Sequence, residues 1–350
     1  MTGKTSQIFN KVKCLDKLNM RQAILDFPKQ FKSGAKAAEG ICLKPGSILR
    51  DPENIIICGM GGSGMPGEII TTLRPIDVFP YKSYSLPPQA GNDSLIICVS
   101  YSGNTEETIS SFQMAIDKKL PVITMTTGGK LEELSKKYDV PCVKLPKPYM
   151  PPRLAIGQMT AGLLKVLENH RLIDKKIVNE ILKIGNSLKA KALEPKGKSL
   201  AKKIFKKIPI IYVSRKFMEI AWIWKNSLNE TAKAIAFSNY FPELNHNEIV
   251  GFEDVNKDQI SCKKIYVLIL RDMEDSHPRI LKQMEITKNI IEKEGVKVEF
   301  VNMAGKTMME KIFSSTILGF WTSYHLALLY KVDPTEIKTI DEFKKQLKKD

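Results

Sequence analysis

The fold of this chain is decided by Val99-Ser100-Tyr101-Ser102-Gly103-Asn104-Thr105-Glu106-Glu107-Thr108. An apolar run from Leu95 to Val99 precedes this stretch and is typical of a buried parallel strand, while a helical pattern follows over 108–116. Hydroxyl side chains and a glycine therefore lie where a strand turns into a helix N-terminus. Unpaired backbone N–H groups and the helix dipole favour an anion there. We expect a phosphate cradle of neutral donors without the lysine of a P-loop.

A second glycine-rich loop follows an earlier apolar strand. Ile55-Ile56-Ile57-Cys58 runs directly into Gly59-Met60-Gly61-Gly62-Ser63-Gly64-Met65-Pro66-Gly67. Glycines let the backbone approach a ligand closely and adopt positive φ angles. Ordinary turn and helix-cap chemistry explains a single cluster of this kind equally well. Two such loops at the carboxyl ends of strands in an open α/β sheet favour a ligand site.

Apolar runs and amphipathic stretches alternate along the first half of the chain. Strands are predicted near 55–60, 79–84, 94–100, 121–126 and 141–145, and helices near 18–37, 63–73, 105–118, 130–137 and 157–169. This order predicts a doubly wound parallel sheet of about five strands. A polar helical span over about 176–207 follows, and the alternation then restarts. The second set comprises strands over 208–214, 264–271 and 296–302, and helices over 217–233, 277–294 and 307–330.

The second half of the chain is a degenerate copy of the first, without its phosphate features. Where the first half has its glycine loop, the second has Ser214-Arg215-Lys216-Phe217. The first half also has a hydroxyl-rich loop, Ser100-Tyr101-Ser102-Gly103-Asn104-Thr105. In its place the second half has Arg271-Asp272-Met273-Glu274-Asp275. The first half is therefore expected to hold a phosphate, and the second must contribute something else to the site.

Composition limits the class of protein. The chain has 350 residues, 43% of them hydrophobic, which is enough for two globular domains. Its net charge is +16, but the lysines fall in pairs on amphipathic helices and no nucleic-acid motif accompanies them, so we expect no nucleic-acid partner. Six scattered cysteines without metal-like spacing, no signal-peptide core and strand-length apolar runs predict a reduced, cytoplasmic protein without a membrane span.

Acid–base candidates occur in the second half. Glu230 lies near the end of the helix over 217–233, and His246 lies in a polar loop between Asn245 and Asn247, whose amides are expected to orient its ring. Taken alone, His246 is better explained as a surface histidine in a solvated loop, and Glu230 is explained as an ordinary helix carboxylate. Arg153 follows a proline-rich turn before a helix, where a cation is unfavourable without an anionic partner. The remaining histidines, His170, His277 and His325, are weaker candidates.

Together these residues resemble the archaeal-type bifunctional phosphoglucose/phosphomannose isomerases, members of the phosphoglucose isomerase superfamily with two sugar-isomerase (SIS) domains. The resemblance rests on the two loops, the Pro-Arg turn, Asn229-Glu230, Asn245-His246-Asn247 and the closing segments 332–335 and 340–344. It implies two SIS-type domains, each a three-layer αβα sandwich with a parallel sheet. The expected divisions are an N-terminal helical segment over 1–37, a phosphate-binding domain over 38–172, a helical linker over 173–200 and an acid–base domain over 201–350.

The same resemblance implies a role for each site residue. The loop residues Gly62, Ser63, Ser100, Ser102 and Thr105 would bind the substrate phosphate. Glu230 resembles the base that moves a proton between C1 and C2, His246 the residue that assists ring opening from the partner subunit of a homodimer, and Arg153 the arginine beside the enediolate. Lys344 resembles the lysine near the ring oxygen, with Lys345 adjacent to it. Thr335 resembles the residue that sets epimer tolerance, with Thr339 as the other candidate.

The implied reaction is the interconversion of glucose 6-phosphate and mannose 6-phosphate with fructose 6-phosphate. Fixed donors and charge can polarise the carbonyl group, so neither a metal nor another cofactor is expected. Two alternatives remain open at this point. One is another SIS isomerase, and the other is a SIS protein that binds a sugar phosphate without turnover.

Overall fold

A computed structural model describes residues 15–44, 52–73, 76–147, 151–253 and 262–347. The chain divides into two compact units. We call Leu25–Ala190 with Thr307–Phe313 the phosphate-loop unit. We call Met1–Ile24, Lys191–Lys306 and Ser314–Asp350 the Glu230 unit. Each unit is built around its own parallel sheet.

The phosphate-loop unit contains a five-stranded sheet in the order β2-β1-β3-β4-β5, and every described pair is parallel. The strands are β1 (Asn54–Cys58), β2 (Val78–Tyr81), β3 (Ser94–Val99), β4 (Val122–Thr126) and β5 (Cys142–Lys144). All six residues of β3 are buried, because helices cover both faces of a parallel sheet. The predicted doubly wound α/β sheet is confirmed.

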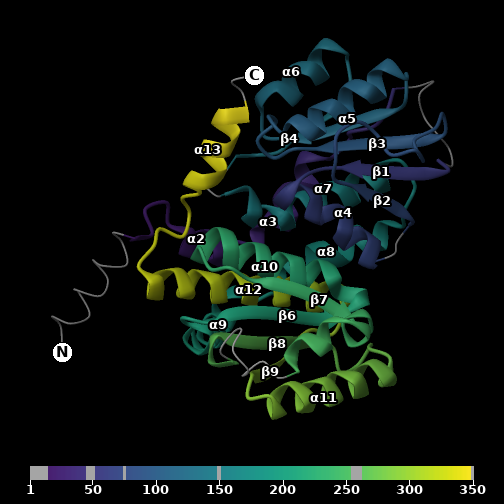
Figure 1. The fold of residues 1–350 in the computed structure, drawn as a ribbon. Coiled ribbons are helices and arrows are strands. Elements are labelled where there is room, and N and C mark those ends of the chain that lie inside the picture. The colour runs from purple at the N-terminus through teal and green to yellow at the C-terminus, as the bar shows by residue number, and fades with distance from the viewer. Residues whose placement is uncertain (1–14, 45–51, 74–75, 148–150, 254–261, 348–350) are drawn as a thin grey trace. The chain divides into compact units, whose positions relative to one another are not determined.

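Helices flank this sheet on both sides (Figure 1). They are α3 (Lys29–Ala37), α4 (Gly61–Leu73), α5 (Glu106–Asp117), α6 (Gly129–Lys137), α7 (Ile156–Asn169) and α8 (Lys175–Ser187). Phe112 of α5 and Leu131 of α6 pack into one core with Ile56, Ile96 and Cys98 of the central strands. The strand order reverses between β1 and β3, so the ends of these two strands face the crevice where α/β proteins bind ligands.

The helix predicted over 18–37 is interrupted. Two helices occupy this span, α2 (Met20–Leu25) and α3, and Pro28 is the N-cap of the second. Proline has no backbone N–H to continue a helix, so the chain starts a new helix at Lys29. Helix α3 then packs closely on α7. A Cβ atom at Gly34 would lie 1.9 Å from the carbonyl oxygen of Gln158, so only glycine fits there.

The Glu230 unit contains a four-stranded parallel sheet in the order β7-β6-β8-β9. The strands are β6 (Ile208–Ser214), β7 (Phe237–Phe241), β8 (Ile265–Arg271) and β9 (Lys297–Asn302). The main helices are α9 (Ala190–Ile204), α10 (Met218–Ala232), α11 (Pro278–Lys293) and α13 (Lys338–Leu347), together with the part of α12 (Met308–Tyr330) from Ser314 onward. Met284 and Ile291 of α11 pack against Val267 and Ile269. Helix α11 lies beside β8 and β9 of this sheet (Figure 1).

Strand β7 and helix α13 were not expected from the sequence. Strand β7 reads Phe-Ser-Asn-Tyr-Phe and pairs only with β6 among the described strands. Only Phe241 of its five residues is buried, so the edge strand lacks the apolar run that marks a central strand. Helix α13 has a strong separation of apolar and polar faces but no buried residue, and hydrophobic clustering gives little signal for such a helix.

The units also differ from the expected divisions. Of the segment expected over 1–37, residues 1–14 lie outside the described residues, and α3 packs on α7 and α8 within the phosphate-loop unit. The expected linker over 173–200 is not separate. Val178, Ile181 and Ile184 give α8 a buried face, and α9 belongs to the Glu230 unit. Apolar faces on these helices require partners, so they extend the two cores.

One helix exceeds the strand-length apolar runs expected from the sequence. Helix α12 is long and apolar enough to cross a membrane by length and composition alone. The structure buries 83% of its most apolar window, as expected for the core helix of a globular protein.

Candidate active site

The hydroxyl-rich loop links β3 to α5, as predicted. Ser100 is fully buried, Thr105 is partly buried, and Ser102 is exposed. The Ser100 hydroxyl donates to Thr105 Oγ1 at 3.0 Å and accepts from the Gly103 N–H at 3.1 Å. The Ser102 hydroxyl accepts from the Asn104 N–H at 3.3 Å. Thr105 is the N-cap of α5 but makes no side-chain cap bond, because its hydroxyl is engaged with Ser100.

The glycine loop contacts the hydroxyl-rich loop through Ser63. Ser63 lies in the first turn of α4 and is 6% exposed. Its Oγ accepts a hydrogen bond from the Tyr101 N–H at 3.0 Å. Ser63, Ser102 and Thr105 thus each accept a bond from the protein and keep a hydroxyl proton to donate. Ser100 has already donated its proton, so it positions Thr105.

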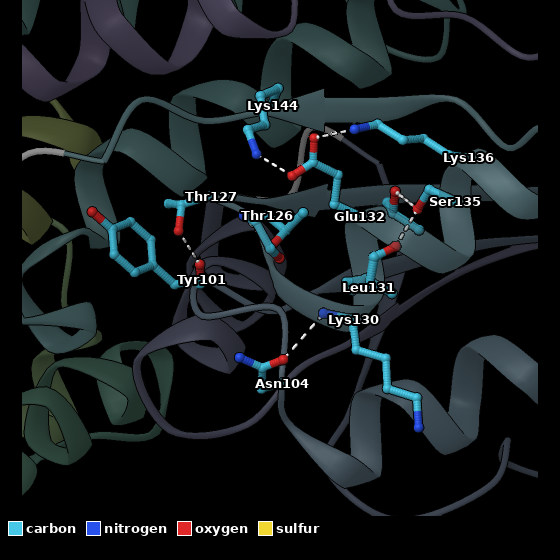
Figure 2. A network of polar contacts seen from close by, with 12 residues as sticks. Tyr101, Asn104, Thr126, Thr127, Lys130, Leu131, Glu132, Ser135, Lys136 and Lys144 are labelled. Atoms are coloured by element: carbon cyan, nitrogen blue, oxygen red, sulfur yellow. Dashed lines mark hydrogen bonds and ion pairs between the residues drawn. The ribbon is translucent and has the colours of Figure 1, made fainter.

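A neighbouring turn holds the hydroxyl-rich loop in place (Figure 2). Thr127 donates to the Tyr101 carbonyl twice, from Oγ1 at 2.7 Å and from its backbone N–H at 3.1 Å. The Lys130 N–H donates to Asn104 Oδ1 at 3.0 Å. Gly103 has a φ of +73°, and a Cβ atom there would lie 1.6 Å from the carbonyl oxygen of Gly128. The loop therefore depends on glycine at 103 and on the turn after β4, neither of which the sequence analysis selected as support.

Arg153 is brought beside the glycine loop. It lies in the short 3₁₀ helix Pro152–Leu154 and is 4% exposed. A Cβ atom at Gly62 would lie 2.9 Å from the Arg153 Cα, so Gly62 permits this close approach. Gln30 of α3 donates to the Leu154 carbonyl at 2.8 Å and accepts from the Gln158 N–H at 3.1 Å. Gln30 thereby fixes the turn that carries Arg153, although its position in the sequence gives no hint of this role.

Burial of the Tyr101 ring affects its ionisation. Tyr101 is 4% exposed, and its hydroxyl has no hydrogen-bond partner among the described residues. Removal from water disfavours the phenolate and raises the pKa of Tyr101 to about 12. Tyr101 therefore brings no negative charge to the phosphate cradle at neutral pH.

The corresponding strand end in the Glu230 unit carries a buried acid. Asp272 follows β8 and is 1% exposed. Its Oδ1 accepts from the N–H groups of Glu274 at 3.1 Å and Asp275 at 3.3 Å. A carboxylate thus occupies the backbone donors that would hold an anion.

Glu230 lies in a cleft within its own unit. It is partly buried in α10 and lines a cavity of about 450 Å³ with Asn229, Lys233 and residues 336–340. Lys233 ends α10 in a left-handed conformation, and its Nζ donates to the Asp333 carbonyl. Lys233 thus ties the C-terminal segment to the helix that carries Glu230. Sequence analysis did not select Lys233. Its position directly after the end of a helix was the one sequence feature that pointed to a capping role.

The predicted C-terminal site residues lie on the segment that forms this cleft. The Thr335 N–H donates to Asp333 Oδ1 at 2.8 Å, in a tight turn before α13. Thr339 lines the cleft. Lys344 is exposed on α13, one turn after Ile340, which also lines the cleft. Lys345 is also exposed, and neither lysine lines the cleft.

His246 does not line the Glu230 cleft. It is exposed in the 3₁₀ helix Glu243–His246 that follows β7. The flanking amides do not orient its ring, contrary to expectation. Asn245 Oδ1 accepts from Thr287 at 2.8 Å, and Asn247 Nδ2 donates to Glu243 at 2.7 Å.

Glu248 holds this loop to the sheet. The Tyr212 hydroxyl of β6 donates to Glu248 Oε1 at 2.6 Å, and Asn239 of β7 donates to Oε2. Burial, followed by the adjacent Glu248 charge, raises the pKa of Tyr212, which keeps the phenol protonated as the donor. Sequence analysis gave Glu248 no role.

Within the described residues, no group of three or more His, Cys, Asp and Glu side chains is arranged to hold a metal ion. Each unit by itself contains one group of candidate residues: the hydroxyl-rich loop, the glycine loop and Arg153 in the phosphate-loop unit, and the cleft at Glu230 in the Glu230 unit.

Comparisons with known proteins agree with this division. Residues 194–347 match the family described as the bacterial phospho-glucose isomerase C-terminal SIS domain. The fold resembles the C-terminal domain of glucosamine-fructose-6-phosphate aminotransferase from Francisella tularensis, with a TM-score of 0.68, 14% identity and coverage of 91% of this chain and 98% of that one. The fold and the hydroxyl-lined loop thus define a SIS-domain protein.

Two curated relatives, both named bifunctional phosphoglucose/phosphomannose isomerase, are 34% identical to this chain. The protein from Caldicellulosiruptor bescii aligns over 94% of this chain and 98% of its own. The protein from Aquifex aeolicus aligns over 85% and 91%, respectively. The chain belongs to the bifunctional phosphoglucose/phosphomannose isomerase family.

Proposed function

We propose that this protein interconverts glucose 6-phosphate and mannose 6-phosphate with fructose 6-phosphate through a cis-enediol intermediate. The observation that carries the proposal is the cradle in which Ser63, Ser102 and Thr105 each accept an internal hydrogen bond and retain a proton to donate. This arrangement suits a phosphate ester. It occurs in a chain whose relatives, aligned over most of their length, are named for both isomerisations.

Phosphate binding uses neutral donors. The hydroxyls of Ser63, Ser102 and Thr105 donate to the phosphoryl oxygens, and the N-terminus of α4 at Gly62 adds backbone N–H groups. Ser100 acts by holding Thr105. The phosphate thus anchors the sugar at the carboxyl ends of β1 and β3 without a lysine.

Proton transfer belongs to Glu230. Its carboxylate removes the proton from C2 of the aldose and returns it to C1, while the O2 hydroxyl proton passes to O1, and the product is the ketose. His246 assists ring opening, Lys344 contacts the ring oxygen, and Arg153 stabilises the negative charge that develops on the enediolate oxygens. A base above one face of a planar enediol serves both C2 epimers when the pocket accepts either hydroxyl orientation, which is the role we give to Thr335.

A homodimer would supply His246 from the partner subunit. In support of this arrangement, His246 is exposed and does not line the Glu230 cleft of its own chain. The same unit exposes large apolar side chains, with Ile235 72% and Phe237 55% accessible. Covering these residues at a subunit interface would remove apolar surface from water.

A location in the cytoplasm, which is a reducing compartment, fits the free thiols of the described cysteines. Cys58 and Cys98 are register partners on β1 and β3, buried, and free thiols. The hydrogen bond to Cys58, with burial, raises the pKa of the Cys98 thiol, which keeps it protonated and unreactive.

A coupled spectroscopic assay with each of the three sugar phosphates tests the function. We expect reversible turnover of both aldoses, unchanged by EDTA. Loss of activity on chelation would contradict the metal-free mechanism. Binding of fructose 6-phosphate without turnover would instead identify a sugar-phosphate-binding protein, and turnover of neither aldose with activity on another sugar phosphate would identify a different SIS isomerase.

A further inference from the structure

A lysine-lined groove lies beside the phosphate cradle in the phosphate-loop unit. It has a volume of about 760 Å³, within the range of small-molecule sites, and lies between α3 and the segment that follows β5. Five lysines line it, Lys29, Lys32, Lys36, Lys144 and Lys147, and no described lining residue is acidic. The candidate site residues do not line this groove.

The positions of the lysines in α3 destabilise this helix. Lys29, Lys32 and Lys36 follow the helical repeat and share one face, while Phe31 and Ala35 are buried on another. Like charges three and four residues apart repel each other, and cations in the first turn oppose the helix dipole. No acidic residue lies in the first turn of α3. A bound anion would relieve both effects.

Acidic neighbours neutralise only part of this charge. Lys29 pairs with Asp26 at 2.6 Å, and both side chains are exposed. Lys144 pairs with Glu132, which also pairs with Lys136 (Figure 2). Within the described part of the chain, Lys32, Lys36 and Lys147 form no ion pair, and all three are exposed. Three uncompensated cations around one hollow attract a ligand with several negative charges.

The walls of the groove are fixed to each other and to the phosphate cradle. Buried Gln158 of α7 donates through Nε2 to the Pro146 carbonyl at 3.1 Å and contacts Ser33 Oγ at 3.5 Å, so it joins both walls. Thr127 lines the groove and donates to the carbonyl of Tyr101 in the hydroxyl-rich loop. Gln158 thus fixes the backbone of one wall to the other, and Thr127 connects the groove to the hydroxyl-rich loop.

We propose that this groove is a second anion site, separate from the substrate cradle, which binds a small metabolite carrying two or more phosphoryl groups. The groove is open to solvent, and its cations gather around one hollow rather than along an extended track, which fits such a molecule better than an extended nucleic-acid backbone. Because Thr127 contacts both sites, occupancy of the groove is expected to change the KM for the sugar phosphate.

Tripolyphosphate is the probe, and binding is measured by isothermal titration calorimetry on the full chain. The variant Lys32→Ala/Lys36→Ala is expected to raise the Kd at least about tenfold, because charge-assisted contacts are lost. Alanine favours the helix, and far-UV circular dichroism checks the fold. The matched control, Lys183→Ala/Lys189→Ala, removes the same charge from exposed lysines outside the groove and should change the Kd less than twofold.

A second arm uses Ser102→Ala, which alters the cradle alone. Unchanged tripolyphosphate binding in this variant supports a separate site and does not depend on the isomerase activity. Four results would overturn the proposal: no binding to the wild-type chain, equal loss in the control, loss in Ser102→Ala with retention in Lys32→Ala/Lys36→Ala, or a preference for a single-stranded oligonucleotide over tripolyphosphate in competition.

Discussion

The Ser63 hydroxyl accepts a hydrogen bond from the Tyr101 backbone N–H at 3.0 Å and so joins the glycine loop to the hydroxyl-rich loop. This contact satisfies a buried donor and at the same time leaves the Ser63 proton available to a ligand. One serine therefore serves both the fold and the proposed phosphate site.

Replacing Ser63 should consequently affect stability as well as binding. In Ser63→Ala the buried Tyr101 N–H loses its acceptor, which costs about 1–3 kcal/mol of the free energy of unfolding. The KM for fructose 6-phosphate should also rise. The matched variant Ser102→Ala removes an exposed hydroxyl and should raise KM with little change in stability or kcat. Urea unfolding and steady-state kinetics separate the two effects, and equal stability of both variants would contradict the dual role.

Gly103 should tolerate no side chain. In Gly103→Ala a Cβ atom would meet the Gly128 carbonyl at 1.6 Å, and the residue has a φ of +73°. Gly40 has a similar φ of +71° with no atom within 4 Å, so Gly40→Ala measures backbone strain alone, about 1–2 kcal/mol. Thermal unfolding should show a clearly larger loss for Gly103→Ala. Equal melting temperatures would show that the loop relaxes around the added methyl group.

Removal of the Glu230 carboxylate should abolish proton transfer while preserving binding. We expect Glu230→Gln to lower kcat by about 10²–10⁴, the usual contribution of a general base, with KM near that of the wild type. Glu336→Gln is the control because Glu336 lines the same cleft. A large fall in kcat for Glu336→Gln and a small one for Glu230→Gln would assign the base to Glu336.

Mixing two inactive variants tests whether His246 acts across a dimer. If each site takes Glu230 from one chain and His246 from the other, a heterodimer of Glu230→Gln and His246→Ala contains one doubly altered site and one intact site. Random exchange makes half of the dimers mixed, so about a quarter of the wild-type activity should return for a closed two-fold dimer. No recovery, with exchange verified by native mass spectrometry, would place His246 in the site of its own chain.

Acid should destabilise the Glu230 unit through His325. Burial lowers the pKa of His325 to about 4. Glu194, 3.4 Å from the His325 ring, acts to raise this pKa, while the charges of Lys198 and Arg21 act to lower it. The unfolded chain therefore binds the proton more readily than the folded one. Stability from this group is complete above about pH 6.5 and is lost as the pH falls towards 4, by about 3 kcal/mol. The melting temperature of His325→Gln should fall less steeply over this range, and an identical pH profile would exclude the effect.

Several features followed from the sequence because they depend on local patterns. Apolar runs such as Ile55–Cys58 and Leu95–Val99 predicted the buried strands of a parallel sheet, since such strands are covered on both faces. The polar residues of the hydroxyl-rich loop directly follow one of these apolar runs, so the sequence also placed them at a strand end. The resemblance to the family also followed from short motifs, because each motif combines residue types suited to a particular chemical role.

Tertiary structure decided what depends on residues distant in the chain. Gln30 holds the Arg153 turn from more than one hundred positions away. Thr127 supports the hydroxyl-rich loop from the turn after β4, and the Gly62 backbone meets Arg153. No local pattern encodes these contacts, because each requires the completed sheet and its helices. The direction of each hydroxyl was decided in the same way. The sequence supplies serine and threonine, but only their folded partners determine which oxygens accept and which protons remain for a phosphate.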